Sequence, residues 1–240
     1  MAVTILDPLL TLSLDMSRIH AFRQFMGLEL NPVSHRERII SLVGGITCIP
    51  AMFAVSGYYV QQDALVPIVA SMGASAVLIF AVPHGALSQP WPLLGGHIVS
   101  AFIGVTCAKL IPHPTMAAAL AVGLAIGAMH YLRCIHPPGG ATALVAVIGG
   151  PAVTALGYQY MFTPVAINAL IMFIVAVVYN GVFPWRVYPA HLRPKHDVGN
   201  ASIRHEDFVY ALSQIDTFLD VDEQDLLRIY DLATRHQAER

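Results

Sequence analysis

The feature that most constrains this chain is a long stretch that is almost free of charge. Between Ile39 and Trp185 only three side chains are charged, and these are Asp63, Lys109 and Arg133. A water-soluble domain needs charged surfaces, and about a quarter of its residues are charged on average. Here 12% of all residues are charged and 56% are apolar. Lipid is therefore the expected solvent of this stretch, and we predict an integral membrane protein in contact with the bilayer.

The charged residues gather at the two ends of the chain, which predicts three parts. Residues 1–38 combine apolar positions at helical spacing with Arg18 and Arg23, so we expect an interfacial amphipathic segment there. Residues 39–186 form the predicted transmembrane domain. Residues 195–240 are rich in acidic residues and predict a soluble, cytoplasmic helical hairpin. The net charge of −2 argues against nucleic acid as a partner.

Six apolar segments follow one another in the transmembrane domain, and they predict an all-α membrane protein. They span residues 39–60, 64–82, 93–111, 114–132, 140–148 and 163–183. The fifth is shorter than the roughly 20 residues that a span requires. We expect it either to re-enter the membrane or to continue through 152–156 after a break. Pro67 weakens the first half of the second segment, so a short or broken helix is expected there too.

An internal repeat divides the domain into two halves. Gly73-Ala74-Ser75-Ala76 resembles Gly140-Ala141-Thr142-Ala143, 67 residues later. Each copy lies in the middle segment of three, so we predict two pseudo-symmetric three-helix repeats over about 39–111 and 114–184. An odd number of spans inverts the second repeat relative to the first, as in many transporters.

Six passes place both termini on one side of the membrane. Arg133 and Arg186 favour the cytoplasm for that side, since positive residues prefer it. We therefore expect a multi-pass protein of a plasma or bacterial-type inner membrane with both termini cytoplasmic. Six short helices bury little interior by themselves, so we also expect a homo-oligomer.

The repeated motif predicts a binding site for a small inorganic anion. If each copy opens a helix, its first N–H groups have no partner and carry the positive end of the helix dipole. Two such helix N-termini facing each other would attract an anion without a buried full charge. The alternative is that the small residues only permit close helix packing. The predicted substrate-binding residues are Ser71, Gly73, Ala74, Ser75, His136, Gly139, Gly140, Ala141 and Thr142.

Polar side chains of the membrane region supply further candidates. His136 directly precedes Pro137 and Pro138, where it could donate to an anion or shuttle a proton, or simply be packed and hydrogen-bonded. The other candidates for a pathway or for proton linkage are His84, His97 and Lys109. Intramembrane polar groups usually face a pathway or the interior. For Lys109 the alternative is that its long side chain reaches to the membrane surface.

Signatures of catalysis are missing from the sequence. It has no Gly-x-Ser-x-Gly, no His-Glu-x-x-His and no phosphate loop. We therefore expect no enzymatic activity, no catalytic residues, no cofactor and no bound metal. The alternative is a metal-dependent membrane enzyme with His130, Cys134 and His136 as ligands, although their spacing is not a tight metal motif.

The chain between Ile39 and Trp185 resembles the HPP family of integral membrane proteins, which is named for a His-Pro-Pro motif. The most specific match is Ile135–Leu144, which contains His136-Pro137-Pro138. Supporting matches are Ser71–Ala76, Phe80–Pro83, Gln89-Pro90 and Gly95-Gly96-His97. The resemblance implies transport of a small anion, with nitrite as the leading substrate. Two alternatives remain: an anion channel of the same architecture, or a membrane-anchored interaction protein that acts through its acidic tail.

Overall fold

The computed structural model describes residues 33–193 and 223–238, together with Phe22 and Met26. The chain divides into two units, 1–38 and 39–240, and the helix bundle belongs to the second. The predicted interfacial segment 1–38 and the predicted first helix of the C-terminal hairpin lie almost entirely outside the described residues. The predicted second helix of the hairpin is α10, Glu223–Ala238, and its Asp225 forms an ion pair of 3.0 Å with Arg193.

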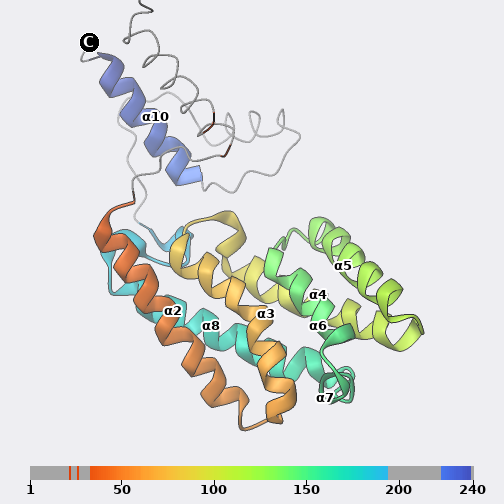
Figure 1. Ribbon diagram of the computed structural model, residues 1–240. Coiled ribbons are helices and arrows are strands. Elements are labelled where there is room, and N and C mark those ends of the chain that lie inside the picture. Colours follow the sequence, from red (N-terminus) through yellow and green to blue (C-terminus); the bar gives the residue numbers. More distant parts are fainter. Residues whose placement is uncertain (1–21, 23–25, 27–32, 194–222, 239–240) are drawn as a thin grey trace, which may run out of the picture. The chain divides into compact units, whose positions relative to one another are not determined.

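The described residues are helical and contain no strand, which confirms the prediction of an all-α membrane protein (Figure 1). Five helices are long and apolar enough to cross a membrane: α2 (His35–Ser56), α3 (Gln62–Ala81), α4 (Pro90–Leu110), α5 (Pro114–Tyr131), and Met161–Gly181, which joins η2 (Met161–Ala166) to α8 (Ile167–Gly181). Proline opens α4 and α5 because its fixed φ suits the first turn of a helix and its missing N–H is not needed there.

The two middle helices of the predicted repeats differ in length. The second repeat has the short helix α6, Pro137–Ile148, followed by Gly150 at a φ of 91° and by the single turn α7, Pro151–Thr154. The fifth segment thus continues after a break. In the first repeat, however, α3 is one continuous helix, so the expectation of a short or broken helix there is wrong. The pseudo-symmetry of the two repeats stays a prediction.

Burial explains why α3 continues past Pro67. A proline inside a helix removes one backbone hydrogen bond. Four apolar neighbours of Pro67 on α3 are buried in the core and offset this loss: Ala64, Leu65, Ile68 and Val69. Tertiary packing therefore overrides the local sequence preference.

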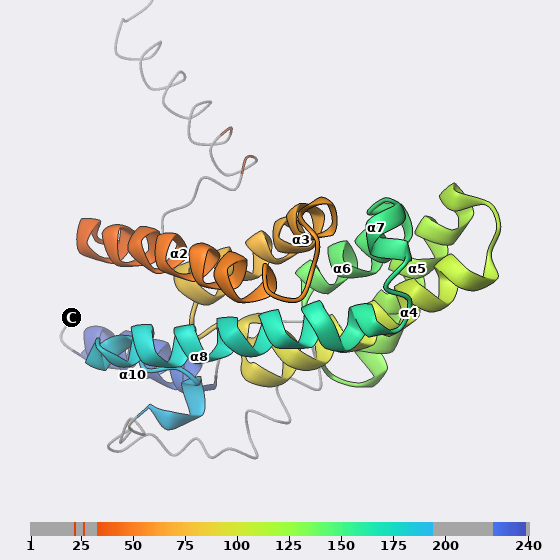
Figure 2. The same cartoon turned by 90° about the horizontal axis from the view of Figure 1, so that it is seen from below.

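Three short 3-10 helices lie between or after the longer helices. They are η1 (Ala86–Ser88) between α3 and α4, and η3 (Pro184–Arg186) and η4 (Ala190–Leu192) after α8. The π-helical segment η2 includes Thr163, whose φ of −122° and ψ of 108° are not helical, so the sixth segment starts irregularly. Beyond this start α8 lies along α3 and α4 (Figure 2).

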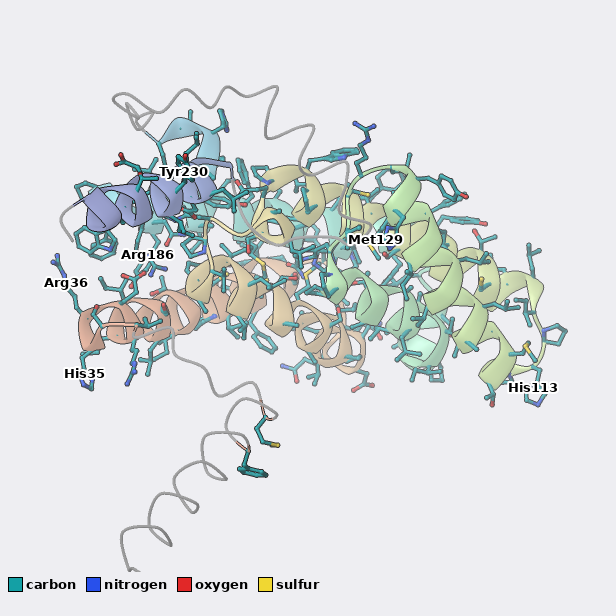
Figure 3. The ribbon with its side chains drawn as sticks, turned by 90° about the horizontal axis from the view of Figure 1, so that it is seen from above. His35, Arg36, His113, Met129, Arg186 and Tyr230 are labelled. Atoms are coloured by element: carbon teal, nitrogen blue, oxygen red, sulfur yellow. The ribbon has the colours of Figure 1, made fainter. Side chains whose placement is uncertain are left out.

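Hydrogen bonds identify which helix ends meet. The Tyr179 hydroxyl near the end of α8 donates to the Ile40 carbonyl near the start of α2, at 2.7 Å. The guanidinium of Arg186 donates to the Phe80 carbonyl at the end of α3. These ends form one end of the bundle, here called the Arg186 end. His113, in the loop between α4 and α5, lies at the opposite end (Figure 3).

The closest helix contact joins α4 and α6, which run parallel. Small residues recur every fourth position on α4 at Gly96, Ser100 and Gly104, and they face Gly139 and Ala143 of α6. A Cβ atom at Gly104 would lie 2.5 Å from the Ala143 carbonyl oxygen, and one at Gly139 would lie 2.9 Å from the Gly96 carbonyl oxygen. In lipid, helices associate through such close backbone packing and interhelical hydrogen bonds, so this contact holds α6 in place.

We predict that Gly104→Ala lowers the free energy of unfolding by about 1–3 kcal/mol, because the added methyl group meets backbone atoms that cannot rotate away. Gly123→Ala on α5 is the matched control, since a Cβ atom there meets nothing within 4 Å. Alanine favours the helix over glycine by up to about 1 kcal/mol, so the control should be neutral or stabilising. Thermal unfolding of both variants in detergent measures the difference. Equal effects of the two substitutions would contradict close α4–α6 packing.

Candidate functional site

Four polar side chains meet in the interior of the bundle, and each is 0% exposed. The Ser75 hydroxyl on α3 lies 2.8 Å from His97 Nε2 on α4 and 2.8 Å from Nε2 of His136, the residue before α6. His97 Nδ1 lies 2.7 Å from the Thr142 hydroxyl on α6, and His136 Nδ1 lies 2.9 Å from the Leu87 carbonyl oxygen. We call Ser75, His97, His136 and Thr142 the histidine network.

The internal repeat contributes two of the four members. Ser75 and Thr142 occupy equivalent positions in the two copies of the repeated motif, and their hydroxyls bind opposite nitrogens of the His97 imidazole. These helices run in opposite directions, because α6 is parallel to α4 and α4 returns from α3 through a short loop. A small residue at Gly96 lets His136 approach α4, since a Cβ atom there would lie 2.5 Å from the His136 Cβ.

Apolar packing surrounds the network, and no fixed charge from the membrane region enters it. The three charged residues between Ile39 and Trp185, which are Asp63, Lys109 and Arg133, are all exposed. Arg186 is buried, but its guanidinium donates to the Asn180 side chain and the Phe80 carbonyl. The two imidazole rings have centroids 4.9 Å apart at an interplanar angle of 65°. Each ring nitrogen has a hydrogen-bond partner, as buried polar groups require. In the part of the chain described, all four ring nitrogens and both hydroxyls of the network therefore have hydrogen-bond partners.

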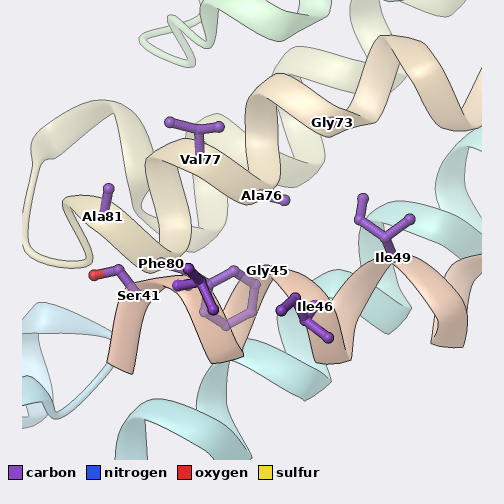
Figure 4. A pocket seen from close by; sticks show the side chains of 10 residues that line it. Ser41, Gly45, Ile46, Ile49, Gly73, Ala76, Val77, Phe80 and Ala81 are labelled. Carbon is purple, nitrogen blue, oxygen red and sulfur yellow. The ribbon is translucent and has the colours of Figure 1, made fainter. Parts of the chain in front are cut away.

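The first copy of the motif does not open a helix, contrary to our prediction. Gly73 lies in the middle of α3, where backbone N–H groups bond within the helix. The Ser71 hydroxyl donates to the Ile68 carbonyl of its own helix at 2.7 Å, and Ala74 is exposed. Gly73 lines a groove of about 450 Å³ between α2 and α3, opposite Ile49 (Figure 4). Of the predicted residues on α3, only Ser75 joins the network.

The second copy lies near a helix start, but that start offers few free N–H groups. Pro137 and Pro138 have none, and the Gly139 N–H donates to the His136 carbonyl at 2.8 Å. Gly140 and Ala141 line an apolar groove of about 500 Å³ between α5 and α6. The predicted pair of opposed helix N-termini is therefore wrong. His136 and Thr142 reach the network through their side chains instead.

The remaining pathway candidates lie apart from the network. His84, in the loop after α3, is half-buried, and its Nε2 has no hydrogen-bond partner in the described residues. Burial lowers the pKa of the His84 imidazole, and the Arg193 guanidinium lowers it further. Lys109 is exposed at the end of the bundle opposite the Arg186 end. Its Nζ lies 5.6 Å from the centroid of the Tyr158 ring, which is a cation–π contact. Only His97 of these candidates belongs to the site.

The three alternative metal ligands have different surroundings. His130 is exposed on α5, whereas Cys134 and His136 are buried. Within the described ranges, no group of three or more histidine, cysteine, aspartate or glutamate side chains is placed to hold a metal ion. The two ring nitrogens of His136 instead form hydrogen bonds with the Ser75 hydroxyl and the Leu87 carbonyl.

Two contributors to the site were missed from the sequence. The Tyr160 hydroxyl donates to the Thr142 carbonyl at 3.0 Å and is fully buried. A tyrosine next to an apolar segment could have suggested a buried hydroxyl that needs a partner. The Leu87 carbonyl, which accepts from His136, has no signal in the sequence because every residue carries a carbonyl.

Comparison with known proteins is consistent with a membrane role. Residues 30–189 match the family model described as HPP, transmembrane region. A transmembrane protein of Dictyostelium discoideum is 37% identical over 188 residues, which cover 74% of this chain and 59% of the relative. A second one from the same organism is 39% identical over 128 residues, covering 52% of this chain and 45% of the relative. The chain thus matches about half the length of these curated relatives.

No solved structure matches the chain. The family match covers most of the helix bundle and every member of the histidine network. The chain therefore belongs to the HPP transmembrane family, and it is an integral, multi-pass membrane protein.

Proposed function

We propose that this protein moves a small monovalent anion, with nitrite as the leading substrate, across the membrane through the histidine network. The observation that carries the proposal is the complete burial of two imidazoles and two hydroxyls between α3, α4 and α6. Ionisable side chains inside a membrane are costly, and they commonly mark solute pathways. Membership of a family of membrane proteins supports transport. The choice of nitrite rests on what the family resemblance implies.

The chemistry of the network suits an anion. Hydroxyl groups donate hydrogen bonds, and an imidazole that takes up a proton adds a positive charge. In the arrangement described, these donors bond to one another, so an anion binds only when some of these hydrogen bonds open. The break at Gly149-Gly150 leaves α6 without a continuous helical connection to α8. We therefore propose that the arrangement described is a closed state and that a movement of α6 opens the site.

Two other functions use the same chain differently. An anion channel would conduct the solute through the same network without opening alternately to the two sides of the membrane. An interaction protein would act through the acidic tail and would not need the network. The proposal includes no catalytic step, and it assigns the four side chains to binding of the anion.

Loss of one hydroxyl tests the site. We predict that Ser75→Ala lowers nitrite uptake into proteoliposomes by roughly ten-fold or more, because two buried imidazole nitrogens lose their common partner. Ser71→Ala is the matched control, one turn away on the same helix, since its hydroxyl bonds only within α3. The control should transport at the wild-type rate.

Nitrate, formate and bicarbonate are tested in the same proteoliposomes. Uptake that saturates with nitrite and exceeds uptake of the other three supports a nitrite transporter, whereas non-saturating flux supports a channel. Equal uptake by both serine variants would place the pathway outside the network.

The distribution of charged residues over the two ends of the bundle supports one orientation of the protein in the membrane. The Arg186 end also carries Arg133, between α5 and α6, whereas Lys109 and Asp63 belong to the opposite end. Positive residues favour the cytoplasm, so we propose that the Arg186 end is cytoplasmic and that both termini share that side. A homo-oligomer in a plasma or bacterial-type inner membrane is part of the proposal.

We predict that an impermeant maleimide labels Tyr58→Cys in intact cells and Tyr131→Cys only in inside-out vesicles. Tyr58 follows α2 and is 86% exposed, and Tyr131 ends α5 and is 92% exposed. The native cysteines Cys48, Cys107 and Cys134 are buried and should give little background. The reverse labelling pattern would contradict the proposed orientation.

Removal of the tail separates transport from an interaction role. We predict that deletion of the residues after His196 leaves nitrite uptake measurable, because the network belongs entirely to α3, α4 and the start of α6. The same proteoliposome uptake measures it. Complete loss of uptake by a protein that still folds would mean that the tail takes part in the mechanism.

A further inference from the structure

We infer that the histidine network is a relay for a single proton, so that the anion moves together with one proton. The first step is the bond between His136 Nδ1 and the Leu87 carbonyl, at 2.9 Å. A carbonyl oxygen only accepts hydrogen bonds, so His136 carries a hydrogen on Nδ1. In the neutral ring, His136 Nε2 then has a lone pair and must accept a hydrogen bond.

That requirement determines every other proton in the neutral network. The Ser75 hydroxyl lies 2.8 Å from His136 Nε2 and has one hydrogen, so it donates there. The Ser75 oxygen then accepts from Nε2–H of His97, also at 2.8 Å. His97 Nδ1 in turn accepts from the Thr142 hydroxyl, at 2.7 Å. All donors therefore point in one direction, from Thr142 toward Leu87.

One added proton reverses this chain without breaking it. A proton that reaches the Thr142 oxygen displaces the hydroxyl hydrogen to His97 Nδ1, and His97 passes its Nε2 hydrogen to Ser75. Ser75 passes its own hydrogen to His136 Nε2, which makes His136 an imidazolium. The Thr142 hydroxyl can then turn to the Pro138 carbonyl, 3.4 Å away. Each hydrogen-bonded group keeps a partner, and the network has gained one proton.

The surroundings favour one extra proton over two. Tyr160 bonds to the Thr142 carbonyl, and Cys134 lies two residues before His136. Near the far end of α4 from the Arg186 end, Cys107 is buried and Lys109 is exposed. Arg186 contacts α3 at Phe80, five residues beyond Ser75. No carboxylate of the membrane region is buried, because Asp63 is exposed. Two imidazolium rings 4.9 Å apart would repel strongly in this setting, whereas one is balanced by a bound monovalent anion.

The relay itself can be measured without any substrate. The probe is solid-state NMR of ¹⁵N-histidine in the full chain in liposomes, with His97→Gln and His136→Gln used to assign the signals. At high pH we expect hydrogen on Nδ1 of His136 and on Nε2 of His97. On acidification both residues should change over one pH interval, with uptake of one proton. The opposite tautomers, or two separate titrations, would overturn the relay.

Coupling to transport rests on the proposed function and is measured separately. Proteoliposomes that contain a pH-sensitive dye are given a nitrite gradient, and protein-free liposomes correct for passive diffusion of the protonated acid. We expect one proton to move with each nitrite ion. Thr142→Val removes the end of the relay and should abolish the coupled proton movement. Thr47→Val is the matched control, since that exposed hydroxyl bonds only to Val43 of its own helix.

The outcomes separate the two claims. Nitrite uptake without proton movement would overturn the coupling and leave the proposed function intact. Absence of nitrite uptake together with the expected tautomers and a single shared titration would overturn the proposed function and support the relay.

Discussion

The close packing of α4 against α6 is the contact on which the rest of this structure depends. The α6 helix is too short to span a membrane by itself. Its position therefore depends on contacts with neighbouring helices. Gly96, Gly104 and Gly139 let the two backbones approach to distances that no side chain would permit. This approach also brings His97 between Ser75 and Thr142, so the same contact supports the fold and assembles the network.

A polar site within an apolar bundle must satisfy its own hydrogen bonds, because neither lipid nor fixed charges are there to do so. The histidine network meets this condition by forming a chain that ends on the Leu87 carbonyl. This chain of hydrogen bonds also determines the tautomers of the two neutral imidazoles. In the function that we propose, movement of α6 and transfer of a proton are the two changes that let the network accept a charged solute.

The repeated motif contributes differently from what its sequence suggests. Small residues in both copies predict two helix starts, but only the second copy lies near one. The shared element is instead the hydroxyl at the third position, Ser75 in one copy and Thr142 in the other. Because α3 and α6 run in opposite directions, these equivalent hydroxyls reach the two nitrogens of one imidazole.

By itself the sequence determined the solvent, the helical class and the approximate positions of the helices, since these follow from the absence of charge between Ile39 and Trp185 and from Pro114, which begins α5. It also identified four residues that meet in the site. Only the tertiary structure decided that α3 continues past Pro67 and Gly73, because buried neighbours offset the weak local preference. It alone showed that side chains rather than backbone N–H groups make the site, since Leu87 and Tyr160 become partners of distant residues only through packing.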